Sequence, residues 1–543
     1  MPTATKSRKR SASKTAKTAD GSSKTSGKSK VKTKSASSSA SSSASSAKAA
    51  ARAAVAVSKG AKAKAASKPA SKSAGKSGGK SASKSRSGGG GGQGITNYTS
   101  ALRWLYEHID YERMRLVRYN DKTFSLDRMR RLLDLLGNPH EHLRCVHVAG
   151  TKGKGSTCAM VASMLQHAGY ATGLYTSPHL VDLRERIAIN SQMVSTSELA
   201  ELFKQIAAKE KAFADEPLTF FEIMTAAAFK HFADQAVDIA VLEVGLGGRL
   251  DCTNVCNPLV TGITHLSLDH TNILGKDVTA IAREKAGIFK SGVPAISVEQ
   301  DPAAAGALRE VADQVGAPLE FTGREIDFSY RFEANKELGP HTRVCLSTQT
   351  SRFEHLPVPL SGEHQAHNCG LALAMLDKLR TRGFDATEEQ VIQGLAKTTI
   401  NGRMEMAWSN PRVIIDGAHN AASMTALIRA MGAHVTYDSL VMIFGCGQDK
   451  DVRGMLQQIA LGADKVIFTR AKANPKAVEP DELLKTFAEV SGKMAQVADS
   501  LDDALKLASR AVSREDLIVV TGSFYLVGEA RKYFMDAAER VGV

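Results

Sequence analysis

A glycine-rich turn between an apolar segment and a helix places the strongest constraint on the fold of this chain. The eight residues from Gly150 to Thr157 read GTKGKGST, after the expected strand 145–149 and before a helical pattern that ends at Gly169. Glycines let backbone N–H groups converge on phosphate oxygens, and the helix N-terminus adds a positive dipole. Lys154 could neutralise the β and γ phosphates, and a hydroxyl could reach Mg²⁺. The segment therefore predicts a nucleoside triphosphate loop rather than an incidental turn.

From Tyr98 onward, short β-branched segments alternate with amphipathic helical patterns, which is typical of a parallel sheet covered on both faces. A second series of strands and helices begins near Arg412. We expect an α/β fold with two domains, residues 98–400 and 401–543. The strands expected in the first domain are 145–149, 171–175, 238–244, 259–266 and 294–298. In the second domain, strands are expected at 413–415, 440–444, 465–469 and 517–521, with helices at 421–431 and 480–490.

The first 97 residues differ from the rest of the chain in composition and charge. They hold 22 Lys and Arg against a single acid, Asp20, which is +21, whereas the whole chain is +15, so the remainder is −6. A Ser, Ala, Lys and Gly composition offers little to bury, so we expect residues 1–97 to be a disordered tail. Nucleic acid is then a partner only through this tail, because the folded part is mildly acidic.

The seven cysteines are odd in number and scattered. This usage suits a reducing compartment and core-filling thiols, and a zinc site is improbable.

No apolar stretch approaches the ~20 residues of a membrane span. We therefore expect a soluble, cytoplasmic protein, and we rank an organelle transit peptide second because the tail is Lys-rich, very long and without an apolar face.

Glu243 ends a second apolar segment and is followed by a glycine turn, residues 245–248. A lone Glu at the end of a strand is usually solvated. In a parallel sheet, however, this strand can present its carboxylate beside the phosphate loop as a ligand for Mg²⁺. Glu243 is therefore a candidate metal ligand.

The compact form GTxGKGS, with only two residues between the first Gly and the Gly-Lys pair, resembles the ATP loop of Mur ligases and folylpolyglutamate synthases. Further segments match this family in order, over most of residues 98–543. The segments with matches are 175–180, 184–187, 219–222, 243–254, 268–275, 282–288, 364–368, 401–405, 416–420, 449–451 and 522–525. The sequence departs from the family at Ala421, where a proline is usual.

The resemblance implies a role for particular residues. The residues implied to bind ATP are Gly150, Thr151, Gly153, Lys154, Gly155, Ser156, Thr157, Asn368, Arg403 and Asp416. The implied Mg²⁺ ligands, for two ions, are Ser156, Ser177, Glu243, His270 and a carbamylated Lys285. The implied catalytic residues are Lys154, His270, Lys285, Arg403 and His419. On sequence physics alone, His270 would be a structural histidine and Lys285 a surface charge.

By the same resemblance, the fold is a Mur-ligase-like ATPase domain with a smaller Rossmann-like C-terminal domain. The implied activity is ATP-dependent addition of L-glutamate to folate, and also to dihydropteroate, through an acyl phosphate. The expected state is a monomer with no membrane partner. Two alternatives stay open: a peptidoglycan Mur ligase, and a non-enzymatic nucleic-acid-associated protein that acts through the basic tail.

Overall fold

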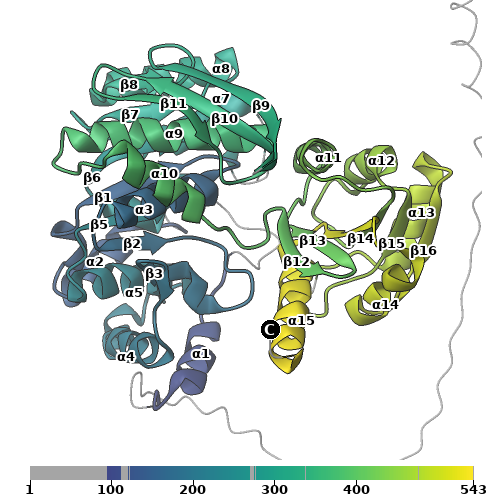
Figure 1. Ribbon diagram of the computed structural model, residues 1–543. Helices are drawn as coiled ribbons and strands as arrows, with labels where there is room; N and C mark the ends of the chain where they lie inside the picture. Colours follow the sequence, from purple (N-terminus) through teal and green to yellow (C-terminus); the bar gives the residue numbers. More distant parts are fainter. Residues whose placement is uncertain are drawn as a thin grey trace, which may run out of the picture. The chain divides into compact units, whose positions relative to one another are not determined.

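The computed structural model describes residues 94–111, 120, 123–268, 274–275, 277–336, 338–474 and 476–541. Almost all of the tail predicted to be disordered lies outside these ranges. Within them, the chain forms three sheets (Figure 1). None of the helices in the described ranges is both long and apolar enough to cross a bilayer.

The largest sheet has eight strands in the order β4-β3-β2-β5-β1-β6-β7-β8. The strands from β2 to β8 along this order pair in parallel, and β3 and β4 extend one edge in antiparallel fashion. Their bounds are β1 Cys145–Ala149, β2 Thr172–Tyr175, β3 Ile187–Ile189, β4 Gln192–Met193, β5 Ile239–Glu243, β6 Pro258–Ile263, β7 Ala295–Ser297 and β8 Leu319–Phe321.

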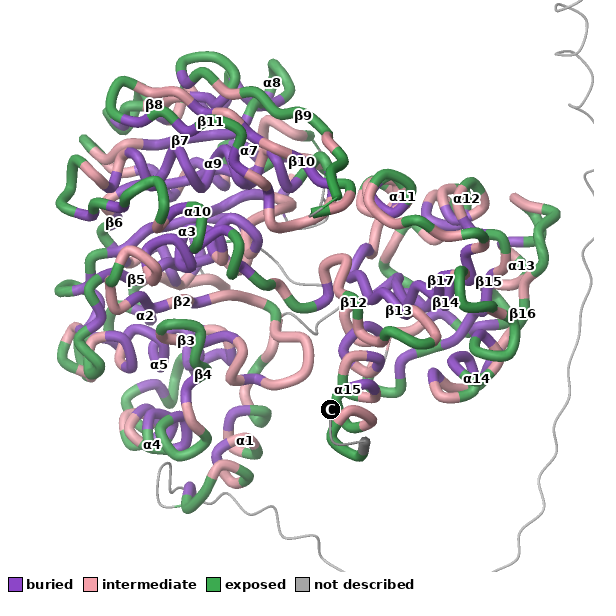
Figure 2. The backbone as a smooth tube through the Cα atoms, viewed as in Figure 1, coloured by how far each residue is buried: buried purple, intermediate pink, exposed green. Residues whose placement is uncertain are grey.

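Helices cover both faces of this sheet, as predicted. The core on one face is formed with α1 Tyr98–Tyr106, α2 Leu126–Leu135, α4 Thr196–Ala207 and α5 Phe220–Asp234. The core on the other face is formed with α3 Lys154–His167, α9 Glu363–Arg380 and α10 Glu388–Lys397. Helices α7 Val278–Ala286 and α8 Pro302–Val315 pack near β7 and β8. Figure 2 shows the strands of the sheet as largely buried.

Capping boxes fix where several of these helices begin. At the start of α5, the Thr219 hydroxyl accepts from the Glu222 N–H, and the Glu222 carboxylate accepts from the Thr219 N–H at 2.8 Å. Such a reciprocal pair satisfies two backbone donors that a helix start would otherwise leave open. The same device begins α4 and α10. These starts are therefore encoded locally.

A three-stranded antiparallel sheet beside α9 was not predicted from the sequence. It has the order β11-β10-β9, with β9 Asp327–Asn335, β10 Gly339–Ser347 and β11 Arg352–Pro357. Most residues of β9 are exposed, so the strand lacks the apolar pattern that would reveal it.

The third sheet has six strands in the order β12-β13-β17-β14-β15-β16, with β12 antiparallel at its edge. Its strands are β12 Glu405–Ser409, β13 Arg412–Asp416, β14 Leu440–Phe444, β15 Lys465–Phe468, β16 Met494–Val497 and β17 Leu517–Thr521. On one face lie α11 Ala421–His434, α12 Val452–Gly462 and α13 Pro480–Val490. On the other lie α14 Leu501–Ala511 and α15 Phe524–Val541. Strands β14 and β17 and helix α13 have the predicted bounds.

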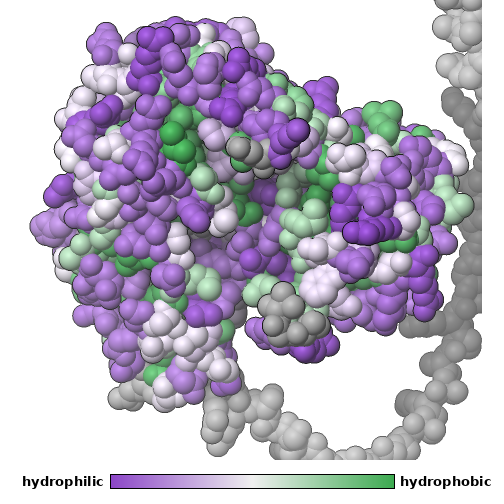
Figure 3. Space-filling view, viewed as in Figure 1, coloured by the Kyte–Doolittle hydropathy of each residue, from purple (hydrophilic) through white to green (hydrophobic). Residues whose placement is uncertain are grey.

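Large exposed apolar side chains are scattered over the described surface rather than gathered on one element. On the face drawn in Figure 3, hydrophobic residues appear as small separate groups among hydrophilic ones. Single exposed apolar residues are normal for a folded protein and do not mark a binding surface.

Candidate functional site

The phosphate loop predicted from the sequence lies between β1 and the start of α3, in the middle of the main sheet. Strand β5 is the parallel neighbour of β1, and its last residue, Glu243, lies opposite Val148. The carboxyl ends of these two strands therefore meet at the same edge of the sheet. This register is the reason that residues about 90 positions apart in the sequence come together.

Two glycines give the loop its shape. Gly150 and Gly153 have φ of +150° and +93°. A Cβ at Gly150 would lie 1.7 Å from Thr264 Oγ1, and one at Gly153 would lie 2.2 Å from Asn368 Oδ1. Both distances are far below contact, so the close approach of neighbouring side chains requires glycine at these two positions.

The loop is also held by backbone hydrogen bonds to the segment after β6. The N–H groups of Thr151 and Lys152 donate to His265 O at 3.1 and 3.2 Å. The Thr151 hydroxyl donates to Ser267 O at 3.2 Å. The donors that remain for a phosphate are therefore those of the first turn of α3, from Gly153 onward.

The first turn of α3 has no side-chain cap, because its N-cap residue is Gly153, and it carries no acidic residue. The Ser156 and Thr157 side chains are buried in this turn. The Thr157 hydroxyl has no hydrogen-bond partner among the described residues. An uncapped helix start with a buried hydroxyl lacking a partner is suited to bind an anion such as a phosphate group.

Glu243 projects into the same place. Its carboxylate lies 3.9 Å from Lys154 Nζ and accepts the Ser177 N–H at 3.0 Å. Gly155 is close as well, since a Cβ there would lie 3.4 Å from Glu243 Oε2. Burial raises the pKa of Glu243, and the nearby Lys154 charge opposes that rise. A buried carboxylate with one distant cation still has oxygen lone pairs to offer a metal ion.

Lys285 is buried. The expectation that it is a surface charge, which rested on the physics of the sequence alone, is therefore wrong. It extends from α7, and its Nζ donates to Gly150 O at 2.9 Å. The side chain thus supports the first residue of the phosphate loop. Carbamylation of Lys285 stays a prediction.

Asn368, on α9, is packed against the loop on its other side. Its amide lies against Gly153, and its Nδ2 donates to Gln365 Oε1 at 2.9 Å. Gln365 and Asn368 are both buried. The segment 364–368 is therefore positioned by α9 beside the loop.

Asp416 is the last residue of β13 in the six-stranded sheet, and His419 follows that strand. Asp416 accepts the Met404 and Ala418 N–H groups, each at 2.9 Å. Burial raises its pKa, whereas the Arg403 guanidinium opposes that rise. The Arg403 guanidinium stacks over the Phe524 ring at 4.9 Å from its centroid.

His419 donates from Nδ1 to Gly417 O at 2.8 Å, since a carbonyl can only accept. Its Nε2 therefore carries the lone pair, and Lys152 Nζ lies 3.4 Å from it. Burial, with Lys152 nearby, lowers the pKa of His419 to about 3. The imidazole is a neutral acceptor at physiological pH.

Most of the predicted site residues fall into two groups. The first group surrounds the phosphate loop and comprises Gly150, Thr151, Gly153, Lys154, Gly155, Ser156, Thr157, Ser177, Glu243, Lys285 and Asn368. The second group surrounds Asp416 and comprises Arg403, Asp416 and His419. His270 lies outside the described residues, so its predicted role is not tested.

Sequence reasoning missed two residues that shape this site. Lys152 was only part of the quoted loop, yet its ammonium lies against His419. His265 contributes through its backbone carbonyl, which a sequence pattern cannot reveal. Lys152 could have been found, because a second lysine inside a phosphate loop is a signal in itself.

Two family profiles match the chain. The Mur ligase middle domain matches residues 148–376, and the glutamate ligase domain of Mur ligases matches residues 402–524. The dihydrofolate synthase/folylpolyglutamate synthase of Bacillus subtilis is 33% identical over 444 residues, covering 81% of this chain and 99% of the relative. The chain belongs to the folylpolyglutamate synthase family of Mur ligases.

Solved structures of this folylpolyglutamate synthase family are also similar to the chain. The Mycobacterium tuberculosis folylpolyglutamate synthase complexed with ADP has a TM-score of 0.72 and 32% identity, over 80% of this chain and 98% of that one. E. coli FolC in complex with DHPP and ADP has a TM-score of 0.70 and 31% identity, over 82% and 99%. The predicted fold class is thereby confirmed.

Proposed function

We propose that this chain is an ATP-dependent ligase that adds L-glutamate to the carboxylate of folate and of dihydropteroate. The observation that carries the proposal is the pairing of Lys154 and Glu243 at the start of α3, where strand register brings a cation and a buried carboxylate to an uncapped helix start. The ADP in the related mycobacterial and E. coli structures supports ATP as the nucleotide.

The residues around Glu243 fit Mg²⁺. Mg²⁺ prefers oxygen ligands and is usually bound through one or two carboxylates, waters and substrate phosphates. Glu243 and the Ser156 hydroxyl supply such oxygens, and we assign them, with Ser177, to hold the first ion. Lys285 would join His270 at a second ion only if carbamylated, because an ammonium repels a cation. When bound, Mg²⁺ would neutralise charge on the β and γ phosphates.

In the first step of the proposed reaction, the folate or pteroate carboxylate attacks the γ-phosphate and ADP leaves. The first-turn N–H groups of α3 and the Lys154 ammonium bind the phosphates, while the Arg403 guanidinium meets charge that develops on the transferred group. Asn368 and Asp416 are assigned to the nucleotide. This step converts the carboxylate to an acyl phosphate. The group that leaves in the next step is then phosphate, which is a far better leaving group than a carboxylate oxygen.

In the second step, the glutamate amine attacks the acyl carbon and phosphate is expelled. The attacking nitrogen must lose a proton. His419, with a pKa of about 3, can accept a hydrogen bond from this N–H but is too weak a base to keep the proton, which the expelled phosphate can take up. We assign His419 to the reaction cleft, since its Nε2 carries the lone pair, with Lys152 close enough to hold the ring in place. Water has to be excluded at this stage, because acyl phosphates hydrolyse.

The proposed function is tested by ADP release from purified protein with tetrahydrofolate or dihydropteroate, each with and without glutamate. We expect release that depends on both the pterin acid and glutamate. Release with tetrahydrofolate but none with dihydropteroate would leave the ligase assignment standing and reject the second substrate. No release with either acid would reject the function.

The same assay separates the rival functions. A peptidoglycan Mur ligase would release ADP with a nucleotide-linked acid and not with pterins. A nucleic-acid-associated protein would release none and would bind DNA in a salt-dependent manner that tail removal abolishes. We further propose a monomer in the cytoplasm, a location supported by seven cysteines that form no disulfide.

A further inference from the structure

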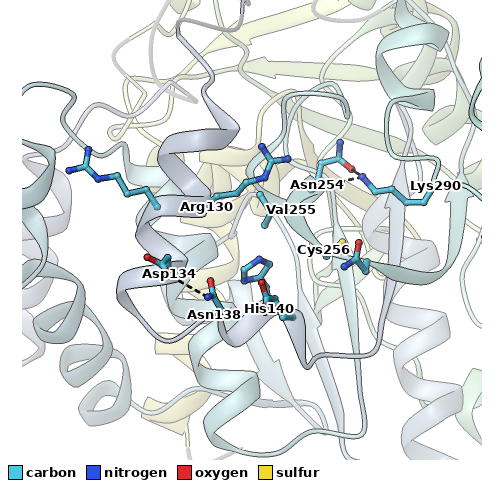
Figure 4. Close-up of a pocket in the computed structure, with 11 residues that line it drawn as sticks. Arg130, Asp134, Asn138, His140, Asn254, Val255, Cys256 and Lys290 are labelled. Carbon is cyan, nitrogen blue, oxygen red and sulfur yellow. Dashed lines mark hydrogen bonds between the residues drawn. The ribbon is translucent and has the colours of Figure 1, made fainter.

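A cavity of about 600 Å³ lies between α2 and the segment that precedes β6 (Figure 4). None of the residues that line it belongs to the phosphate loop. The cavity is lined by residues of α2, by the segment that follows α2, by residues 254–257 and by Lys290. Cys145 is the first residue of β1 and pairs with Pro258, the first residue of β6. The cavity therefore opens near the amino ends of these strands, whereas the phosphate loop follows the carboxyl end of β1.

Two cysteines lie beside this cavity. Cys256 lines the cavity, and Cys145 belongs to the same buried core cluster, near enough for the two thiols to shift each other's pKa. Both residues are buried in the same core cluster, with 0% of Cys145 and 1% of Cys256 exposed. The pairing of β1 with β6 holds the two thiols together, because Cys256 immediately precedes the start of β6. A disulfide can form only between two cysteines that are close neighbours, and Cys145 and Cys256 meet that condition.

A buried histidine provides a base next to Cys256. His147 lies two residues after Cys145 on β1 and is fully buried. Its Nε2 lies 2.8 Å from the Thr253 hydroxyl, which in turn donates to Asp251 Oδ1 at 2.5 Å. Because the single hydroxyl proton goes to the carboxylate, His147 Nε2 must be the donor to Thr253. Its Nδ1 then holds the lone pair, and this buried atom has no fixed partner among the described residues.

A lysine adds positive charge on the cavity side. Lys290 lines the cavity, and its Nζ donates to Asn254 Oδ1 at 2.9 Å, a contact drawn in Figure 4. The Cys145 thiol, followed by the nearby His147 and Lys290, lowers the pKa of Cys256 below its usual range, against the opposing effect of burial. The Cys256 thiol and burial raise the pKa of Cys145. Cys256 is therefore the sulfur of the pair that loses its proton more easily.

We propose that Cys256 and Cys145 form a site of reversible oxidation by hydrogen peroxide, which reaches Cys256 through the cavity. The Cys256 thiolate attacks one peroxide oxygen and breaks the O–O bond, which gives a sulfenic acid and hydroxide. The hydroxide takes up the proton that Cys256 lost. The Cys145 sulfur then attacks the sulfenic sulfur, its proton leaves with the hydroxyl as water, and a disulfide remains. Two thiols and one peroxide yield one disulfide and two waters.

The other buried thiols lack this environment. Burial raises the pKa of Cys369 and of Cys446 to about 12, and no neighbouring thiol contributes to either shift. Thiolate character and access decide where oxidation occurs. Cys446, in the six-stranded sheet, is therefore a matched control for Cys256.

The test uses the full chain, reduced and then exposed to hydrogen peroxide for increasing times. Remaining thiols are blocked in denaturant, and peptides are mapped by mass spectrometry. We expect a peptide linking Cys145 to Cys256, lighter by two hydrogen atoms, which dithiothreitol removes. The free thiol of Cys256 should disappear at least about tenfold faster than that of Cys446, since the thiolate is the reactive form of cysteine.

Variants separate the roles of the two sulfurs. In Cys145→Ser, dimedone should trap Cys256 as a sulfenic acid, because the resolving thiol is absent. In Lys290→Met, the oxidation of the Cys256 thiol should slow several-fold. Cys446→Ser should leave the yield of the linked peptide unchanged. The proposal is overturned if the native protein yields no linked peptide, or if Cys256 and Cys446 are oxidised at equal rates. Thermal unfolding of each variant confirms that it is folded.

Discussion

Glu243 is a buried charge, Lys154 is a partly buried one, and the two are in weak contact. Their side chains are 6% and 16% exposed, and 3.9 Å separates the nearest atoms. Removing two such ions from water costs several kcal/mol each, and a contact this long recovers only part of that cost. Such a pair is poorly explained as a stabilising feature. It is better explained by a third partner with charges of both signs, such as a metal-bound phosphate.

We therefore predict that Glu243→Gln and Lys154→Ala each lower ADP formation by at least about 10²-fold to 10³-fold, because each removes a contact to developing charge. The midpoint of thermal unfolding should change little. Lys506→Ala is the control, since Lys506 is exposed on α14. Normal turnover in either site variant would remove these residues from the mechanism.

Lys285 offers a second test at this scale. Lys285→Ala should lose activity as severely as Lys154→Ala, because it removes the group implied to become a carbamate and the bond to Gly150 O. Added short carboxylates such as acetate should restore part of the activity by occupying the space of the carbamate. Full activity without acetate would show that Lys285 acts only as a buried structural residue.

The protonation of His419 makes a prediction about pH. Its pKa of about 3 in the folded protein lies below the ordinary histidine value of 6.5, so between these values the unfolded chain binds a proton that the native state does not. Stability should therefore fall as the pH drops from about 6.5 towards 3, by at most about 1.4 kcal/mol per pH unit. His419→Asn should reduce this slope in denaturant titrations at pH 7 and pH 5. An unchanged slope would contradict a buried neutral imidazole.

Among the secondary structure elements, the loop between β1 and α3 depends on glycine for two separable reasons. One is backbone conformation, and the other is the space that a Cβ would occupy. Gly153 and Gly169 have nearly the same φ, +93° and +96°. A Cβ at Gly153 would overlap Asn368, whereas a Cβ at Gly169 would have nothing within 4 Å. The two glycines bracket α3 and so form a matched pair.

We predict that Gly169→Ala lowers the free energy of unfolding by about 1–2 kcal/mol, the cost of a left-handed backbone conformation for a residue with a Cβ. The KM for ATP should stay unchanged. Gly153→Ala should carry the same cost and also displace Asn368, which raises the KM for ATP or lowers kcat. Thermal unfolding and ADP release measured on both variants separate the two effects. Equal kinetics in the two variants would show that the contact with Asn368 is unimportant.

Across the whole molecule, charge is divided unevenly. The first 97 residues carry +21 and the remainder −6, so the strongly basic character of the chain belongs to the tail. The predicted site residues all lie after that segment. We predict that deleting residues 1–93 leaves kcat and the KM values for ATP and folate within about twofold of the full chain, because such a segment cannot contribute to a packed core. A large rise in KM on deletion would mean that the tail attracts anionic substrates.

Sequence reasoning located the parts of the fold whose local pattern is strong. The bounds of β1 and β14 were predicted correctly, since both are buried parallel strands with continuous apolar residues. The sheet formed by β9, β10 and β11 was missed because most residues of β9 are exposed, which leaves that strand without an apolar pattern. The order of strands in each sheet was not predicted either, because register depends on contacts between distant segments.

The same contrast holds for the site. The place of Glu243 could be predicted because a glycine turn follows it and because the segment 243–254 resembles that of a known family. The burial of Lys285 could not, since its neighbours on α7 follow an ordinary amphipathic pattern. Its environment is set by the packing of α7 against the loop, a tertiary contact that no local pattern encodes.

The hydrogen bonds from Thr151 and Lys152 to His265 O also have a thermodynamic consequence. Both bonds join backbone groups of this chain to each other and need no ligand to form, so we expect the loop to be preorganised before a nucleotide arrives. Ordering a flexible loop costs roughly 1–2 kcal/mol per residue, and that cost falls on folding instead of on binding. These two amides should consequently exchange with deuterium at slow rates that ATP hardly alters, and nucleotide affinity should reflect contacts made rather than disorder lost.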